Sequence, residues 1–252
     1  MSADVVEFQE IAPGIVQIVM RDVASKNAFS PALVAGLGQA FDRIRDERRC
    51  RVAVLTGYDN YFCSGGTREE LLALHQGHCR FTDLIGGIYR AALDCEVPVI
   101  AAMQGHGIGG GFVFGLFADF VVLSRESVYT TNFMKFGFTP GMAATYLVPK
   151  KLGLGLGHEM LLAARTYRGA DLEKRGVPFA VLPRSDVLAH AHQLAQDLAD
   201  MPRASLVLLK NRLVADLREQ LPAHVEHELA MHEATLHTPE VATRIARTFA
   251  GT

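Results

Sequence analysis

The sequence predicts an α/β core followed by a helical C-terminal region. Short apolar runs of strand length alternate with helix-periodic segments through the first 185 residues, as expected where strands pair in parallel. Beyond residue 185, four helical segments follow one another without a further strand pattern. We therefore expect an α/β region at residues 1–185 and a helical region at residues 186–252.

The first 50 residues predict a β-hairpin and a helix. Residues 5–10 and 15–20 alternate weakly between apolar and polar side chains around Pro13-Gly14, which favours a hairpin. Ser30 suits the N-cap and Pro31 the first helical position, so a helix is expected from there to about residue 47. Its apolar side chains recur at the spacing of one buried helix face: Leu33, Leu37, Ala40, Phe41 and Ile44.

The remaining elements follow from apolar runs and prolines. Buried strands are expected at residues 51–57, 98–103 and 120–123. C-terminal helices are expected at residues 186–200, 204–219, 222–236 and 239–249, because a proline lies at or just before each start. Their periodic leucines and valines indicate packing on the core or on a neighbouring subunit.

Composition excludes several classes of protein. The chain has 252 residues, 49% hydrophobic and 21% charged, with a net charge of −2, so it is globular and has no bulk basic surface for nucleic acid or anionic membrane. Its four cysteines form no Cys-x-x-Cys pair, which indicates free thiols in a reducing, cytoplasmic compartment and no zinc site. No signal peptide or membrane span is expected.

Two glycine-rich segments each follow a strand and precede a helix, at residues 62–67 and 105–111. The first turn of a helix leaves backbone N–H groups unpaired, and glycine lets a ligand oxygen approach them closely. Two such helix starts aimed at one point form an oxyanion hole, which holds the charge of an enolate. The alternative is that these glycines serve tight turns and close packing alone.

Other motifs offer alternatives. Gly105, Gly107 and Gly110 match the dinucleotide fingerprint, with Glu126 some 20 residues on, although the expected helix is short and the motif lies mid-chain. His227 and His232 are one residue too far apart for a His-Glu-x-x-His zinc site, so no metal is expected. His224 and Glu228 are spaced to pair on a solvated helix face.

Two further features have a structural and a functional interpretation. Arginines 43, 45, 48, 49 and 51 form a basic stretch at the end of the first helix. They fit either favourable helix-dipole placement or a docking patch for an acidic carrier protein. Cys63 is expected to be a small wall residue beside the glycines rather than a nucleophile.

Five segments together resemble the crotonase (enoyl-CoA hydratase/isomerase) superfamily, in the family's order and over nearly the whole chain. They are Asn27-Ala28, residues 62–66, residues 98–111, Ala118-Asp119 and residues 137–141. The resemblance implies a ββα spiral core, a helical C-terminal region that forms a homotrimer, and an acyl thioester bound by its carbonyl oxygen. It places the two oxyanion-hole donors at the N–H groups of Gly66 and Gly110.

Departures from the family pattern limit the reactions that this chain is expected to catalyse. Family hydratases have glutamates at about the positions of Val113 and Phe133, and these two side chains cannot move the protons of water. Residues 81–83, 129–135 and 231–235 resemble the crotonase branch that decarboxylates acyl groups in polyketide β-branch formation. In that branch a lysine and a C-terminal histidine flank the substrate carboxylate.

The branch resemblance assigns the histidine to His232 and leaves His78 or Arg80 at the lysine's place. Ser64, Val113 and Phe133 are expected to line the substrate site. The expected activity is decarboxylation of a 3-methylglutaconyl-type thioester, tethered to acyl carrier protein or CoA, with no cofactor. An enoyl thioester isomerase and a non-catalytic acyl-binding scaffold are the alternatives.

Overall fold

The computed structural model describes residues 5–80 and 86–249, and these form two sheets with helices around them. The larger sheet has the order β1-β2-β3-β5-β7-β10. All its neighbouring strands are parallel except the N-terminal hairpin. Its strands are β1 (Val6–Ala12), β2 (Ile15–Met20), β3 (Val52–Thr56), β5 (Val99–Met103), β7 (Phe120–Ser124) and β10 (Ala180–Leu182).

The smaller sheet has the order β4-β6-β8-β9, with only the last pair antiparallel. Its strands are β4 (Tyr61–Cys63), β6 (His106–Ile108), β8 (Val128–Thr130) and β9 (Thr166–Arg168). Along the chain, one strand of each sheet and then a helix repeat as β3-β4-α2 and β5-β6-α5. This repeat is the ββα core expected of a crotonase-like α/β protein, so the predicted fold class is confirmed.

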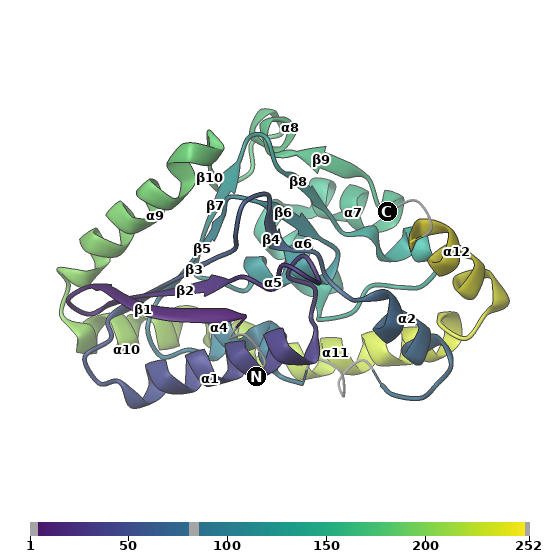
Figure 1. Cartoon of the computed structure of the whole chain (residues 1–252), viewed down its shortest axis with the longest axis horizontal. Coiled ribbons are helices and arrows are strands. Elements are labelled where there is room, and N and C mark those ends of the chain that lie inside the picture. The colour runs from purple at the N-terminus through teal and green to yellow at the C-terminus, as the bar shows by residue number, and fades with distance from the viewer. Residues whose placement is uncertain (1–4, 81–85, 250–252) are drawn as a thin grey trace.

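The helices cover both sheets (Figure 1). Those before residue 140 are α1 (Pro31–Asp46), α2 (Arg68–His75), η1 (Ile88–Arg90), α4 (Ala91–Asp94), α5 (Gly110–Leu116) and η2 (Asn132–Phe136). Those after it are α6 (Ala144–Leu152), α7 (Leu154–Ala163), α8 (Gly169–Lys174), α9 (Arg184–Ala199), α10 (Arg203–Leu213), α11 (Ala215–Thr235) and α12 (Pro239–Phe249).

Helix α1 forms as the sequence predicts. The Ser30 hydroxyl accepts a hydrogen bond from the Leu33 N–H (3.1 Å), and Pro31 begins the helix. The side chains of the predicted stripe are buried, except for Phe41, which is half-buried. Helix α1 runs away from the loop at Phe29, so its start lies near the C-terminal end of β2 and its basic end lies far from it.

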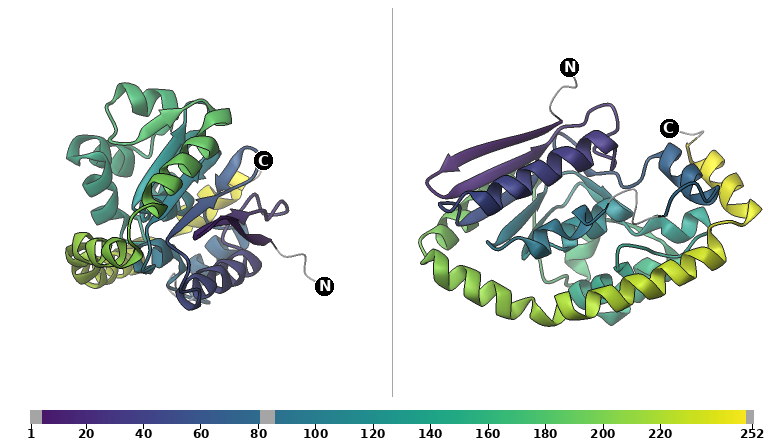
Figure 2. Two further views of the ribbon diagram at one scale, coloured as in Figure 1. Left: turned by 90° about the vertical axis from the view of Figure 1, so that its left-hand side faces the viewer. Right: turned by 90° about the horizontal axis from the view of Figure 1, so that it is seen from below.

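The C-terminal helices differ from the prediction at one point. A helix boundary was expected at Pro222, but α11 continues through Pro222 and the boundary lies at Val214. Leu217 and Leu221 are buried just before the proline, and Glu228 and His232 are buried after it. Packing of this face on the core outweighs the local cost of the proline. Helices α10 and α11 run as one long arc beneath the molecule (Figure 2).

The helical region is attached to the core by a buried cation. The Lys210 ammonium donates to the carbonyl oxygens of Ala92 (2.8 Å) and Val97 (2.9 Å). It also pairs with the Asp119 carboxylate (2.7 Å), which accepts the Val99 N–H (2.8 Å). Because a buried charge is tolerated only with such partners, this network fixes α10 against the start of β5.

Two glycines of α1 provide a matched test of the helix packing. A methyl group on Gly38 would meet nothing within 4 Å, so Gly38→Ala is expected to raise the free energy of unfolding by about 0.5–1 kcal/mol through helix propensity. A methyl group on Gly36 would lie 2.8 Å from the Val6 Cγ2 atom, so Gly36→Ala is expected to lower it by about 1 kcal/mol or more. Urea denaturation of both variants measures the difference, and equal effects would contradict this packing of α1 on β1.

Candidate active site

The two glycine-rich segments meet at one edge of the smaller sheet. Strands β4 and β6 are parallel neighbours, with Cys63 beside Gly107, so the loops after them leave the sheet side by side. Gly65 has a φ of +83°, and a Cβ there would lie 2.6 Å from the Ile108 carbonyl oxygen and 3.5 Å from the Gly110 nitrogen. Gly65 is therefore a glycine because the two loops pack closely there, as the close-packing interpretation predicts. This close approach of the loops brings the N–H groups of the neighbouring residues Gly66 and Gly110 toward each other.

Gly66 and Gly110 both line one cavity of about 560 Å³. Gly110 is the first residue of α5, and Gly66 precedes Thr67, the N-cap of α2. Neither N–H donates a hydrogen bond to any residue that the structure describes. Two free donors at adjacent helix starts are the geometry that an oxyanion hole requires.

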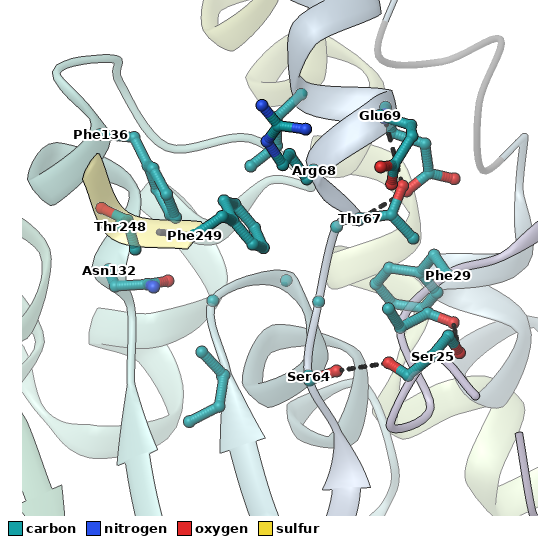
Figure 3. A pocket seen from close by; sticks show the side chains of 18 of the residues that line it. Ser25, Phe29, Ser64, Thr67, Arg68, Glu69, Asn132, Phe136, Thr248 and Phe249 are labelled. Carbon is teal, nitrogen blue, oxygen red and sulfur yellow. Dashed lines mark hydrogen bonds between the residues drawn. The ribbon is translucent and has the colours of Figure 1, made fainter. Parts of the chain in front are cut away.

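The rest of the cavity wall is mainly apolar. Its larger apolar side chains are Phe29, Leu71, Leu74, Phe133, Phe136, Phe138, Met142 and Phe249. Figure 3 shows Phe136 and Phe249 next to each other on one side, and their rings stack with centroids 6.1 Å apart. The wall also has charged and polar side chains, which include Lys26, Arg68, Glu69, Glu70, Asn132 and Thr248. The apolar part of this wall is suited to an acyl chain.

The three expected substrate-site residues have different places. Ser64 and Phe133 line the cavity. The Ser64 hydroxyl donates to the carbonyl oxygens of Lys26 (2.7 Å) and Ser25 (3.2 Å), so it fixes the loop that ends at Phe29 (Figure 3). Val113 lies further along α5, is fully buried in the core and is not among the cavity-lining residues that the structure describes.

His232 lines a second cavity of about 450 Å³. Leu74 belongs to the walls of both cavities. Phe138, a wall residue of the first cavity, packs edge-on against the His232 ring with centroids 6.1 Å apart. The His232 Nε2 atom lies 2.9 Å from the Thr139 carbonyl oxygen, and burial lowers the pKa of this imidazole.

The structure separates the two candidates for the position of the lysine. Arg80 lines the His232 cavity together with Cys79 and Glu233. His78 and Arg80 are both exposed, but His78 is not among the described residues that line either cavity. The Phe81–Asp83 segment, part of the resemblance to the decarboxylase branch, lies outside the described residues. Arg80 is therefore the better placed cation.

Glu228 was expected on a solvated helix face, and this prediction is wrong because the side chain is 1% exposed. Its carboxylate accepts hydrogen bonds from the N–H groups of Ala143 (2.6 Å) and Thr145 (2.8 Å) and from the Thr145 hydroxyl (2.6 Å). Burial nevertheless raises the pKa of Glu228 to about 7. Its expected partner His224 instead stacks on Tyr146, with centroids 4.1 Å apart.

The other candidate residues either lie outside the cavities or are already hydrogen-bonded within the protein. Burial raises the pKa of the Cys63 thiol to about 12, so it is not a nucleophile. Cys63 is not among the described residues that line the two cavities but lies buried in the core, so its expected place in the cavity wall is wrong. The Glu126 carboxylate accepts from Ser124 and from the Arg184 N–H, so it is not held open for a ribose. Within residues 5–80 and 86–249, no group of three His, Cys, Asp or Glu side chains is placed to hold a metal.

The basic stretch lies at the wrong end of α1 for the cavity. Arg43 stacks on Phe8 at 3.9 Å, and Arg45 pairs with Asp42 at 2.9 Å. Arg51 donates to the Ala199 carbonyl oxygen at 2.6 Å. A helix of 16 residues is about 24 Å long, and the cavity adjoins the other end of α1. Only Arg43 and Arg45 lie in the last turn of α1, where they suit the helix dipole. A carrier protein docked at this stretch would be remote from the glycines.

The comparisons with known proteins agree with this geometry. Residues 10–248 match the enoyl-CoA hydratase/isomerase family. The chain belongs to this family. Within it, the chain is 62% identical over 245 residues to the bacillaene synthase decarboxylase PksI of Bacillus subtilis, covering 97% of this chain and 98% of that protein.

Two solved structures of the family are similar over almost the whole chain. One comes from a dehydratase/decarboxylase enzyme couple of polyketide β-branching, with 63% identity, a TM-score of 0.94 and coverage of 96% of this chain and 95% of that one. The other is the ECH2 decarboxylase domain of CurF from Lyngbya majuscula, with 46% identity, a TM-score of 0.91 and coverage of 98% and 100%. None of the described helices is long and apolar enough to cross a membrane.

Proposed function

We propose that this protein is a decarboxylase of polyketide β-branching that removes CO2 from a 3-methylglutaconyl-type acyl thioester on an acyl carrier protein. The observation that carries the proposal is the 62% identity, over 97% of the chain, to a decarboxylase of bacillaene synthase. The free N–H pair in an apolar cavity supplies what this reaction needs. The chain keeps no glutamate at the two positions of the hydratase pattern, where Val113 and Phe133 stand.

The oxyanion hole provides the electron sink. When the bond between the carboxylate and the γ-carbon of the acyl group breaks, its electron pair moves through the carbon–carbon double bond onto the thioester oxygen. The N–H groups of Gly66 and Gly110 hold the negative charge of this dienolate. The apolar walls favour the step further, because they solvate a carboxylate less well than neutral CO2.

Two side chains complete the proposed reaction. Arg80 orients the carboxylate, since a guanidinium binds a carboxylate through two parallel hydrogen bonds. His232 then returns a proton to the dienolate carbon. Leu74 and Phe138 are the side chains between the N–H pair and the His232 cavity, because one lines both cavities and the other lines the first and packs on His232. Substrate entry displaces them in this proposal.

Mass spectrometry of the acyl group tests the function directly. The protein is incubated with 3-methylglutaconyl thioesters of acyl carrier protein and of CoA. Loss of CO2, faster on the carrier protein, is the expected result. A shifted double bond without loss of mass indicates the isomerase instead, and binding without turnover indicates the scaffold. Either of these outcomes contradicts the proposal.

We also propose that the enzyme is a cytoplasmic homotrimer. Leu208, Leu209 and Leu213 of α10 are 72%, 58% and 73% exposed, a cluster that an isolated subunit leaves to solvent. Light scattering after gel filtration is expected to give the mass of three chains, and Leu213→Asp is expected to reduce it. A monomer at micromolar concentration contradicts this assembly.

A further inference from the structure

Helix α11 holds one loop of the cavity wall at three points. The loop runs from Gly137 to Ala143, directly before α6, and places Phe138 and Met142 in the wall of the glycine cavity. Thr235 and His232 hold its beginning, through contacts to the Thr139 hydroxyl (3.2 Å) and the Thr139 carbonyl oxygen (2.9 Å). Glu228 holds its end, through the N–H groups of Ala143 and Thr145.

The end of this loop has an unfavourable backbone conformation. Met142 and Ala143 have φ values of +64° and +54°, in the left-handed region that side chains with a Cβ rarely adopt. Helix α6 begins directly afterwards and has no side-chain cap from its own N-cap residue, Ala143. The Glu228 carboxylate takes that place from 85 residues away, and its hydrogen bonds hold the left-handed turn.

This turn determines where the Met142 side chain lies relative to the proposed oxyanion hole. A Cβ built on Gly110 would lie 2.7 Å from the Met142 Sδ atom, so the thioether covers the Cα of a proposed donor residue. A shift of the turn moves Met142 relative to the Gly110 N–H. Glu228 itself is not among the described residues that line this cavity, so it reaches the site only through the loop.

We infer that Glu228 is a positioning residue that sets the oxyanion hole by fixing the left-handed turn at Met142 and Ala143. For its effect on turnover, this inference rests on the proposed decarboxylation. The position of Met142 can be measured without substrate, so the inference about Glu228 can be tested separately from the proposed decarboxylation.

Glu228→Gln is the variant of choice, because it keeps the shape but turns one oxygen into an amide donor that faces a backbone N–H. Its matched control is Glu226→Gln, an exposed carboxylate on the same helix. We expect Glu228→Gln to lower kcat roughly tenfold or more with KM changed less than about twofold, and the control to leave both unchanged. Thr145→Val, which removes one donor to the carboxylate, is expected to change kcat in the same direction by less and serves if Glu228→Gln does not fold.

The methionine methyl groups provide the readout that is independent of activity. In protein labelled with 13C-methyl methionine, the Met142 signal, assigned with Met142→Leu, is expected to shift or broaden in Glu228→Gln. The signal of Met201, which is 51% exposed in the connection between α9 and α10, is expected to stay in place.

A rescue variant separates positioning from general stability. Glycine adopts the left-handed conformation without the strain of a Cβ atom. Ala143→Gly is therefore expected to restore part of the lost kcat when it is added to Glu228→Gln. The inference is overturned if folded Glu228→Gln keeps the wild-type Met142 signal, whatever its activity, or if its kcat equals that of the control. It is also overturned if Ala143→Gly restores thermal stability without restoring kcat.

Discussion

Gly110→Ala is expected to lower kcat for decarboxylation by about two to three orders of magnitude, the range measured when one oxyanion-hole donor is lost. The added methyl group would lie 2.7 Å from the Met142 Sδ atom and 3.3 Å from the Phe29 ring. The first contact is too close and the second is tight, so either the Met142 side chain and the wall move or the Gly110 N–H turns away from the thioester oxygen. A misplacement of this size at a reacting centre is costly even where substrate still binds.

The control is Gly38→Ala, where a methyl group meets nothing within 4 Å and α1 gains helix propensity. It is expected to keep wild-type kcat and KM. Decarboxylation is followed as release of CO2 from the acyl carrier protein thioester, at a temperature where both variants are folded by circular dichroism. Alanine keeps the backbone N–H, so full activity in folded Gly110→Ala would show that the methyl group is accommodated without displacing this donor, and would contradict the predicted steric constraint at the hole.

The site could be predicted from sequence where its parts are local. Each glycine segment lies between a strand and a helix, so the helix starts at Arg68, just after Gly66, and at Gly110 follow from short-range patterns. That the two starts meet depends on β4 and β6 pairing in parallel. The resemblance to the crotonases implied this contact, and no local pattern did.

The residues that α11 contributes were harder to predict, because their burial and their hydrogen-bond partners depend on packing against distant parts of the chain. A helix end at Pro222 is the local expectation, yet the buried row Leu217, Leu221, Glu228 and His232 continues through it. That row has the spacing of one helix face, so it was a signal that Glu228 belonged inside. Its partners at Ala143 and Thr145 are more than 80 residues away and are backbone groups, which no side-chain pattern reveals.

His232→Gln is expected to lower kcat by about two to four orders of magnitude, the usual contribution of a general acid. Glutamine keeps an N–H that can donate to the Thr139 carbonyl oxygen, 2.9 Å from Nε2 in the wild type, so the fold is retained. It has no proton to give at neutral pH. His227→Ala, an exposed histidine on the same helix, is the control and is expected to behave as wild type.

The pH dependence of kcat identifies the proton that His232 delivers. Burial lowers the pKa of this ring below its usual 6.5, while the carbonyl oxygens of Thr139 and Pro140 and the Glu233 carboxylate oppose the shift. Arg80 lines the same cavity. If the imidazolium is the acid, kcat falls as the pH rises through this lowered pKa, and the fall disappears in His232→Gln.

Deuterium labelling gives the outcome that decides the role of His232. In D2O the wild type is expected to place one deuterium at a single carbon of the product. In His232→Gln the slow residual reaction is expected to distribute it between the α- and γ-carbons, because water then protonates the dienolate without direction. Wild-type kcat and a single labelled carbon in this variant would exclude His232 as the acid, and the proton source would have to be sought at the glycine cavity itself.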